Sequence, residues 1–386
     1  MGWDDYAEGF RRLGGLTAML EKPDDPDLAA AAHRLIFLSL SSGYMTAFAD
    51  PDRPDFVPAV NTAHNAVGVN PDFIYYHAAV DGSGQYRITG NRGDGLFLLM
   101  DIAAGGLGAM DDLGPSLALV DFDTLNLGPD GSIDLLLSST RPPAWTGDWR
   151  ALDPAAKTLA VRQASYDWGA GDDARLTIER IDRPVASARI TPAETAKRLQ
   201  RLLSHPERFA GLALKFMAGQ RAKQLLNAFE HDDWAGRGGV TGQHYYQGLF
   251  RIEPGQLLIL ETALPETVRY WNVQLSDPLW NAVDWLNHQS SVNGGQAQID
   301  SDGKFRAVIA LEDPGVPNWL DPAGWRDGLV MLRWTEATSG PAPILTSVPC
   351  ADLRAHLPCD TPLITPEARE AALRHRRRGV QRRRRW

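Results

Sequence analysis

The stretch from Arg269 to Asp321 concentrates the side chains best suited to hold a small molecule and act on it. It contains Trp271, Trp280, Trp285 and Trp319, interleaved with amide and carboxylate side chains. Flat apolar walls with a few orienting polar groups are typical of a ligand pocket. The same composition is typical of a buried sheet with Trp in its core and Asn or Asp in its turns, so both interpretations stay open.

The aspartates of this stretch are candidates for acid/base catalysis. If residues 277–288 form a helix with Asp277 as its N-cap, a polar stripe containing Asp284 and His288 lies along one face. Two carboxylates in different environments can divide the acid and base roles, as they do in glycosidases. The alternative is that these aspartates only cap and form turns. The candidate catalytic residues are Asp284, Asp313, His288 and Asp321.

Aromatic faces and nearby polar groups are the candidates for substrate binding. On a helix Trp280 and Trp285 would point in different directions, and Trp285 adjoins Asp284, so we expect Trp285 to face the ligand and Trp280 to be core. Arg92 could hold an anionic group, or it could pair with Asp94. The candidate substrate-binding residues are Trp271, Trp285, Trp319, Asn287, Asn318, Tyr75 and Arg92.

The motifs predict neither a metal nor a cofactor. The nine histidines form no His-x-His or His-Glu-x-x-His motif, and a metal site would need His288 and Asp284 with His244 or His64. The two cysteines do not form a Cys-x-x-Cys motif. No Gly-x-Ser-x-Gly elbow is present, and the glycine-rich VDGSGQYRITGNRG lies in a predicted hairpin rather than before a helix. The βαβ unit of nicotinamide or flavin enzymes is also absent from the pattern.

Short apolar segments separated by turn residues predict antiparallel sheets. Asp81-Gly82 and Asn91-Arg92-Gly93 favour hairpins, because these residues tolerate positive φ. Short strands without βαβ alternation favour sandwiches over a doubly wound sheet. The predicted strands cover 73–80, 85–89, 96–102, 116–120, 133–137, 158–163, 175–181, 245–252, 256–262, 268–275, 296–299, 305–311 and 328–336.

Helical patterns surround these strands and divide the chain. Apolar spacing predicts helices over 3–20 and 28–44, and Thr191-Pro-Ala-Glu predicts a helix start, with a break at His205-Pro206. We therefore predict a mainly β protein with two antiparallel, jelly-roll-like β-sandwiches. The predicted divisions are a helical cap (1–60), a first β-sandwich (61–190), a helical connector (191–235), a second β-sandwich (236–355) and a C-terminal extension with a disordered Arg-rich tail (356–386).

Several segments resemble a bacterial family. NPDFIYYHAAVDGSGQYRITGNRG in the first β region, and RYWNVQLSDPLW and NGGQAQIDSDGKFRAVIALEDPGVPNWLD in the second, resemble the domain of unknown function 1214. Some members of that family carry a companion domain of unknown function 1254. The resemblance covers about 61–353 and implies two β-sandwich units joined by helices, but it implies no catalytic residues.

Composition and charge limit the partners. Hydrophobic residues make up 44% and charged residues 23% of the chain, as in globular proteins, and no apolar run is long enough to span a bilayer. The first residues, MGWDDYAEGF, carry acids where a secretory signal has Lys or Arg, so we expect a cytoplasmic protein without a membrane partner. The net charge is −9 although RHRRRGVQRRRRW carries eight arginines. Nucleic acid is expected only as a nonspecific contact of this tail, and homo-oligomerisation stays open.

Two functions agree with this pattern. The first is an enzyme, a hydrolase or lyase that uses carboxylate acid/base catalysis on a ring-bearing hydroxylated substrate, such as a glycoside or polycyclic compound. The second is a non-catalytic small-molecule binding or carrier protein with a Trp-lined pocket. Paired carboxylates across a cleft would favour the enzyme, and a closed apolar cavity would favour the carrier.

Overall fold

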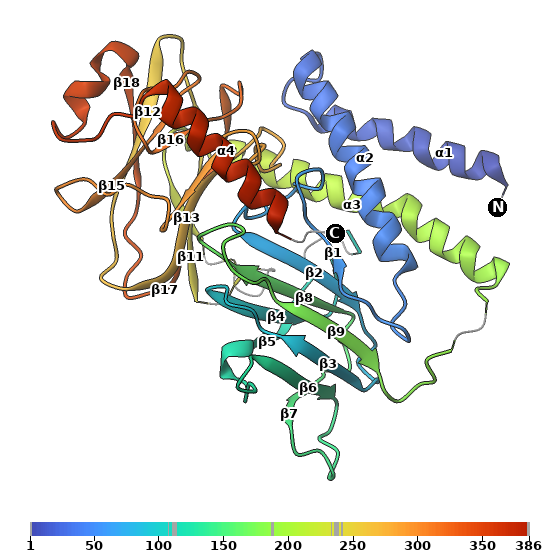
Figure 1. Ribbon diagram of the computed structural model, residues 1–386. Coiled ribbons are helices and arrows are strands. Elements are labelled where there is room, and N and C mark those ends of the chain that lie inside the picture. The colour runs from blue at the N-terminus through green and yellow to red at the C-terminus, as the bar shows by residue number, and fades with distance from the viewer. Residues whose placement is uncertain are drawn as a thin grey trace.

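The computed structural model describes residues 2–106, 108–109, 114–186, 189–232, 234, 239–240 and 242–383. The protein is mainly β with helices, and its strands form four open sheets in two β regions (Figure 1). The predicted fold class is therefore confirmed. None of the helices in this part of the chain combines the length and apolar character needed to cross a membrane.

The first β region pairs a five-stranded sheet with a four-stranded sheet. Side chains from both sheets, including Ile88, Leu98 and Leu135, are buried between them. Sheet A has the order β1 (Val57–Pro58), β2 (Phe73–Ala79), β8 (Thr158–Ala164), β4 (Phe97–Ala103) and β5 (Ser116–Asp121). Sheet B has the order β7 (Asp148–Ala151), β6 (Ser132–Ser138), β3 (Tyr86–Asn91) and β9 (Arg175–Arg180).

The second β region repeats this arrangement. Trp271, Trp334 and Phe305 belong to the apolar core between its two sheets. Sheet C has the order β10 (Glu230–Asp232), β11 (Gln243–Arg251), β17 (Asp327–Ala337), β13 (Val268–Ser276) and β14 (Ser291–Asn293). Sheet D has the order β16 (Trp319–Leu320), β15 (Lys304–Ile309), β12 (Gln256–Ala263) and β18 (Ile344–Pro349).

Strand alternation decides which face of sheet C is polar. Trp271, Val273 and Leu275 of β13 belong to the core against sheet D, because successive side chains point to opposite faces. Asn272 and Gln274 therefore lie on the opposite face, where both are buried. That polar face meets sheet A, since Tyr270 of β13 packs against Phe73 and Phe97. The strand predicted over 296–299 is wrong, because these residues form a turn and a single β-bridge at Ile299.

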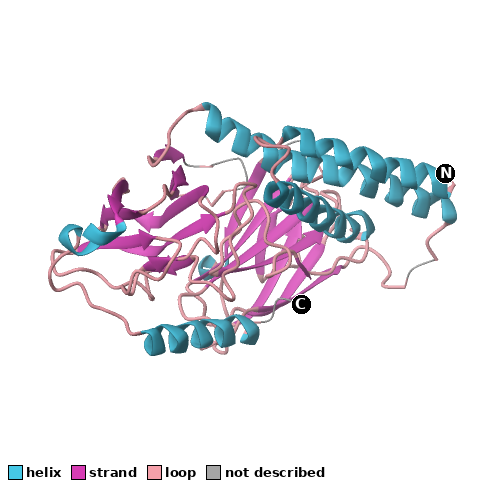
Figure 2. Ribbon diagram, turned by 90° about the horizontal axis from the view of Figure 1, so that it is seen from above, coloured by secondary structure: helices cyan, strands magenta, loops and turns pink. Residues whose placement is uncertain are grey.

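Three helices form a layer beside the sheets (Figure 2). They are α1 (Trp3–Leu13), α2 (Pro26–Phe48) and α3 (Pro192–Ala222), and a 3-10 helix (Gly14–Met19) follows α1. The predicted cap of α3 is present, because the Thr191 side chain accepts a hydrogen bond from the Glu194 amide at 3.2 Å. The predicted break at Pro206 is wrong, since α3 continues through this residue.

The C-terminal segment is the largest departure from the sequence prediction. After a 3-10 helix (Cys350–His356), residues Pro366–Arg382 form α4, which Figure 1 shows lying across the second β region toward sheet A. Arg369, Arg376 and Arg383 are buried. The predicted disordered tail is therefore wrong for the residues up to Arg383. The spacing of seven places these three arginines on one face of the helix, and their guanidinium groups hydrogen-bond to the body of the protein.

Candidate functional site

A cavity of about 180 Å³ lies between sheet A and the polar face of sheet C. We call it the intersheet cavity. Its walls combine valine and tryptophan side chains with a small number of charged and polar groups, which is typical of small-molecule sites. The residues that line it include Val60, Val67, Gly68, Val69, Tyr75, His77, Asp101, Thr158, Ala160, Arg162, Trp234, Val240, Tyr245, Trp280, Met331 and Arg333.

Sheet A forms one polar wall of the cavity, because the pairing of β2, β8 and β4 brings their polar side chains side by side. His77 of β2 lies opposite Ala160 of β8, which lies opposite Asp101 of β4. One step along the sheet, Tyr75 lies opposite Arg162. Because residues at i and i+2 share a face, these side chains all line the cavity. Ala160 therefore forms a low floor between an imidazole and a carboxylate.

Sheet C supplies Arg333, whose side chain is buried in the opposite wall. Its Nη1 donates to Gln274 Oε1 at 2.6 Å and to Asn272 Oδ1 at 3.3 Å, and its Nη2 donates to the Gly68 carbonyl at 2.9 Å. All three acceptors are neutral. Within the described ranges Arg333 forms no ion pair, although it is only 5% exposed. A buried charge without a countercharge is costly, so this guanidinium is suited to an anionic ligand.

The loop that carries Gly68 is held in an uncommon conformation. Val67 has φ 59°, Gly68 has φ 61°, and Trp280, which faces them, has φ 67°. The Gly68 amide donates to the Trp280 carbonyl at 2.8 Å. A Cβ on Gly68 would lie 2.4 Å from Trp280 Nε1, so only glycine fits here. Positive φ at valine and tryptophan is rare and concentrates at functional sites.

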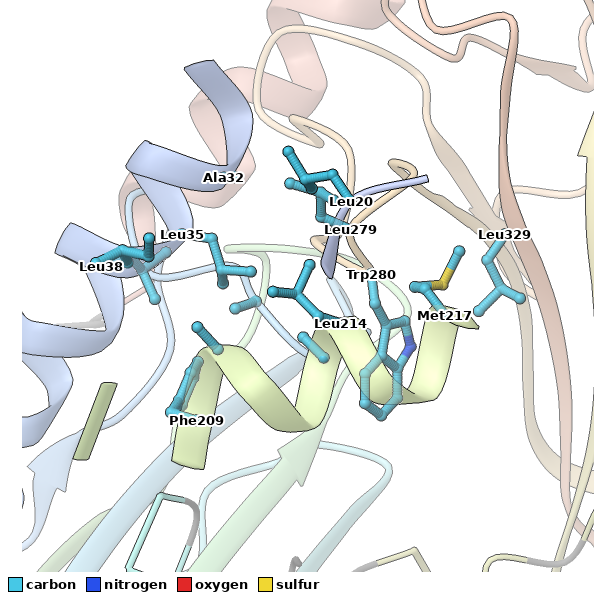
Figure 3. Close-up of a cluster of buried hydrophobic side chains, with 14 of the residues drawn as sticks. Leu20, Ala32, Leu35, Leu38, Phe209, Leu214, Met217, Leu279, Trp280 and Leu329 are labelled. Carbon is cyan, nitrogen blue, oxygen red and sulfur yellow. The ribbon is translucent and has the colours of Figure 1, made fainter. Parts of the chain in front are cut away.

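An aromatic wall connects the cavity to the helical layer. Trp280 stacks on Phe216 of α3 with ring centres 3.9 Å apart and lies 5.7 Å from Trp234. Figure 3 shows Trp280 beside Met217 of α3, among the apolar side chains of this cluster. The wall is therefore anchored by α3, which holds the indole rings in place.

The sheet A wall carries an imidazole, a carboxyl group and a phenol hydroxyl, whereas the sheet C wall carries the Arg333 guanidinium. Burial, together with the positive charge of Arg162, lowers the pKa of His77 to about 4, so its imidazole is neutral at neutral pH. In the described part of the chain, neither ring nitrogen of His77 has a hydrogen-bond partner. Asp101 is 6% exposed and accepts a hydrogen bond from Ser116 Oγ. Burial raises the pKa of Tyr75, whose hydroxyl accepts a hydrogen bond from the Asn70 amide at 3.0 Å.

The predicted catalytic residues lie away from the intersheet cavity. Asp284 is exposed and accepts hydrogen bonds from the amides of Leu286 and Asn287, which makes it a turn residue. Asp313 accepts from the Gly315 amide and forms an ion pair with Arg369. Two of the four residues are joined by a side-chain hydrogen bond, and the backbone amide of His288 also donates to the Asp284 carbonyl at 3.2 Å.

That pair is His288 and Asp321, with His288 Nδ1 2.7 Å from Asp321 Oδ2. The hydrogen bond to Asp321 raises the pKa of His288. The expected helix over 277–288 is wrong, because these residues form turns and a bridge. Asp277 accepts from the amides of Leu279 and Asn281, as a cap would, but the positive φ of Trp280 ends the helical path.

Of the predicted substrate-binding residues, only Tyr75 lines the intersheet cavity. Trp285 is 1% exposed and packs in a core with Val380 of α4. Trp280 is buried in an apolar cluster, as expected for a core residue, and it also lines the cavity. Arg92 pairs with Asp123, with Nε 2.6 Å from Oδ1, rather than with Asp94.

The remaining candidates hold loops and cores. Trp271 is buried between sheets C and D. The Trp319 indole donates to the Ala310 carbonyl at 2.9 Å. Asn318 donates to the carbonyls of Gln298 and Arg306, and Asn287 donates to Asp284. These contacts agree with the second interpretation of the sequence, a buried sheet with Trp in its core and Asn in its turns.

Two features of the sequence indicate the polar walls of the cavity. In FIYYHAAV, the period of two places Tyr75 and His77 on the face opposite Ile74 and Ala78, so one face of the strand carries a hydroxyl and an imidazole. Arg162 and Arg333 each lie within a strand that is largely buried, where a charge is unusual.

The residues that a metal site would need do not lie together in the structure. His244 Nδ1 lies 3.0 Å from His231 Nε2, and His64 Nε2 lies 3.1 Å from Ser41 Oγ. Over the residues that the structure describes, no group of three or more His, Cys, Asp or Glu side chains could hold a metal ion.

A solved structure with the same architecture exists. An uncharacterised protein from Burkholderia cenocepacia is 28% identical, with a TM-score of 0.84, and the match covers 90% of this chain and 97% of that chain. The VPA0106 protein from Vibrio parahaemolyticus matches with 12% identity and a TM-score of 0.47, over 83% of this chain and 99% of that chain. No family model and no curated protein matches the chain. The resemblance to domain of unknown function 1214 therefore stays a prediction.

Proposed function

We propose that the protein binds a small organic carboxylate in the intersheet cavity. The carboxylate contacts Arg333, and the apolar body of the ligand lies against the valine and tryptophan side chains. One observation carries the proposal: Arg333 is buried in the cavity wall, and its hydrogen bonds go only to neutral oxygens. Three hydrogen bonds also leave donor capacity on a guanidinium with five N–H groups.

The apolar part of the cavity supports the same proposal. Val60, Val67, Val69 and Val240 line it together with Met331. These side chains favour an aliphatic or aromatic ligand body, because removing apolar surface from water stabilises the complex. A fully hydrated inorganic anion would gain nothing from these walls.

We favour a binding function over an enzyme in which the predicted catalytic aspartates carry out hydrolysis or elimination. Asp284, Asp313 and Asp321 do not line the cavity. Acid/base catalysis by these residues stays a prediction that the cavity does not support. Among the described lining residues, Asp101 supplies the carboxyl group and His77 the imidazole that a catalytic reaction in the cavity could use.

Calorimetric titration with hexanoate and hexanamide tests the proposal. We expect hexanoate to bind about tenfold or more tightly than the neutral amide, because a charged hydrogen-bond pair is worth about 1.5–3 kcal/mol. Arg333→Met should remove this preference. Arg87→Met removes the same charge from an exposed pair with Asp134 and should leave it unchanged. Equal binding of both ligands to the unmodified protein would contradict the proposal.

A further inference from the structure

Asp101 is a second buried charge without a countercharge in the same cavity. It is 6% exposed, and Ser116 Oγ is its hydrogen-bond donor. Across the described ranges no ion pair includes Asp101, and Arg162, its diagonal neighbour on β8, has interactions of its own. The cavity therefore presents the buried guanidinium of Arg333 and the buried carboxyl group of Asp101 on opposite walls, with Arg162 as a second, less buried guanidinium.

We propose that the ligand is a zwitterion of the amino acid type, with its carboxylate at Arg333 and its ammonium group above Ala160, between Asp101 and His77. This inference rests on the proposed carboxylate binding and adds a second recognition element to it. The ammonium group donates to the Asp101 carboxylate and to a ring nitrogen of His77. A ligand with one charge of each sign satisfies both buried groups at once.

The floor at Ala160 provides the space that an ammonium group needs. His77 and Asp101 lie on the strands to either side of Ala160. Two strand spacings separate their backbones by about 10 Å. Both side chains extend into the cavity above a methyl group, so a compact cation can lie between them. Thr158, two residues before Ala160 on the same face, adds a hydroxyl to this end of the cavity.

His77 is suited to accept a hydrogen bond from a cation. Neutral imidazole has one acceptor nitrogen, whereas the protonated ring would repel the ligand. Burial is the main reason why the pKa of His77 is lowered, and the positive charge of Arg162 on β8 adds to the effect. No group within the described chain occupies the ring nitrogens.

The size of the cavity limits the ligand to a small molecule, because its volume is about 180 Å³. Arg333 lies in the sheet C wall, and Asp101 and His77 lie in the sheet A wall. The ligand therefore presents its carboxylate and its ammonium group to opposite walls, and an amino acid with an apolar side chain or a short ω-amino acid is of this kind.

Ligands that differ by one charged group measure how much the carboxylate and the ammonium group each contribute to binding. Titrations would compare leucine with 4-methylpentanoate, which lacks the amine, and with 3-methylbutylamine, which lacks the carboxylate. A second set would compare 5-aminopentanoate with pentanoate. In at least one set we expect the zwitterion to bind about tenfold or more tightly than the carboxylate alone, the effect of one charged hydrogen-bonded pair.

Three variants connect this preference to its residues. Asp101→Asn keeps the shape and should abolish the preference for the zwitterion, while the affinity for the carboxylate analogue changes by less than about threefold, because Arg333 is intact. His77→Gln should weaken the preference by a smaller factor. Asp134→Asn removes the same charge outside the cavity and should have no effect. If Asp101→Asn does not fold, Ala160→Leu tests the same position by filling the floor, and it should weaken zwitterion binding.

The outcomes distinguish the two proposals. If the carboxylate analogues bind as tightly as the zwitterions in both sets, the zwitterion inference is overturned and carboxylate binding stands. If Asp101→Asn retains the preference, the ammonium position is wrong. If hexanoate and both sets fail to bind the unmodified protein, the proposed function itself fails.

Discussion

The guanidinium of Arg376 lies 4.3 Å from the centre of the Trp168 ring, so an α4 side chain covers an aromatic residue of the first β region. The same group donates to the Trp285 carbonyl at 2.7 Å and to Ser291 Oγ at 2.6 Å. Burial lowers the pKa of Arg376 to about 10, which leaves it charged at neutral pH. The arginine-rich helix therefore joins the two β regions.

Replacing Arg376 should destabilise the protein. Arg376→Met removes the hydrogen bonds and leaves the Trp285 and Ser291 oxygens buried without donors, so we expect a loss of about 3 kcal/mol in the free energy of unfolding. Arg377→Met, at the next and exposed position of α4, is the matched control and should change stability by less than about 0.5 kcal/mol. Denaturant unfolding measures both, and equal effects would contradict the docking of Arg376.

A single methyl group at Gly68 should disturb the intersheet cavity. Gly68→Ala places a Cβ against the Trp280 indole and forces alanine into a left-handed conformation, which alone costs about 1–2 kcal/mol. Gly315→Ala is the control, because Gly315 has φ 73° and no atom near its Cβ position. Only Gly68→Ala should weaken hexanoate binding. Unchanged affinity would place the ligand away from Trp280.

The two central tryptophans should respond differently to substitution. Trp285→Leu removes a fully buried aromatic side chain and should cost about 3 kcal/mol of stability without changing ligand affinity, because Trp285 does not line the cavity. Trp280→Leu should weaken ligand binding, since its indole forms part of the wall. Titration and thermal unfolding of both variants measure these effects. A binding loss confined to Trp285→Leu would reverse this assignment.

The pH dependence of stability should report His77 and His205. Burial lowers the pKa of both to about 4. Below the ordinary value of 6.5 the unfolded chain binds a proton that the folded protein does not, so stability falls as the pH drops from about 6.5 to about 4. Each histidine contributes at most about 3 kcal/mol to this loss.

Comparing histidine variants with the unmodified protein tests whether His77 and His205 cause this loss of stability. His77→Gln and His205→Gln should each flatten the pH profile of the unfolding free energy between pH 6.5 and 4. Asp72 and Asp277, whose pKa values burial raises, act in the opposite direction but are unchanged in the variants. An identical profile for His77→Gln and the unmodified protein would show that His77 is not buried in its neutral form.

The sheets could be predicted because each strand carries its own signal. Alternation in the segment around Tyr75 and the turn residues at Asp81-Gly82 are local properties of the chain. The helix at α4 was missed because its arginines indicate a solvated segment. Their side chains can nevertheless be buried where a planar guanidinium meets a ring and several carbonyls, and those partners lie far away in the sequence.

The cavity could not be predicted for a related reason. Ala160 becomes a floor only when β2 and β4 flank β8 in one particular register, and that register is a property of the whole sheet. Trp280 enters the wall because its backbone adopts positive φ, which no rule for tryptophan predicts. Residue types alone therefore directed attention to Trp285.

The contact between Asp72 and Arg383 has a consequence for biosynthesis. The Asp72 carbonyl accepts a hydrogen bond from Arg383, which follows it by 311 residues. The Asp72 carboxylate is bound by Tyr270 Oη at 2.6 Å and by Asn293 Nδ2 at 2.6 Å, so none of its second-region partners exists when the first sheets leave the ribosome. At roughly 5–20 residues per second, translation from Arg180, where the first sheets end, to Arg383 takes about 10–40 s. During this interval the nascent first β region exposes the polar surface that later closes the cavity, and ribosome-associated chaperones have their longest opportunity to bind it.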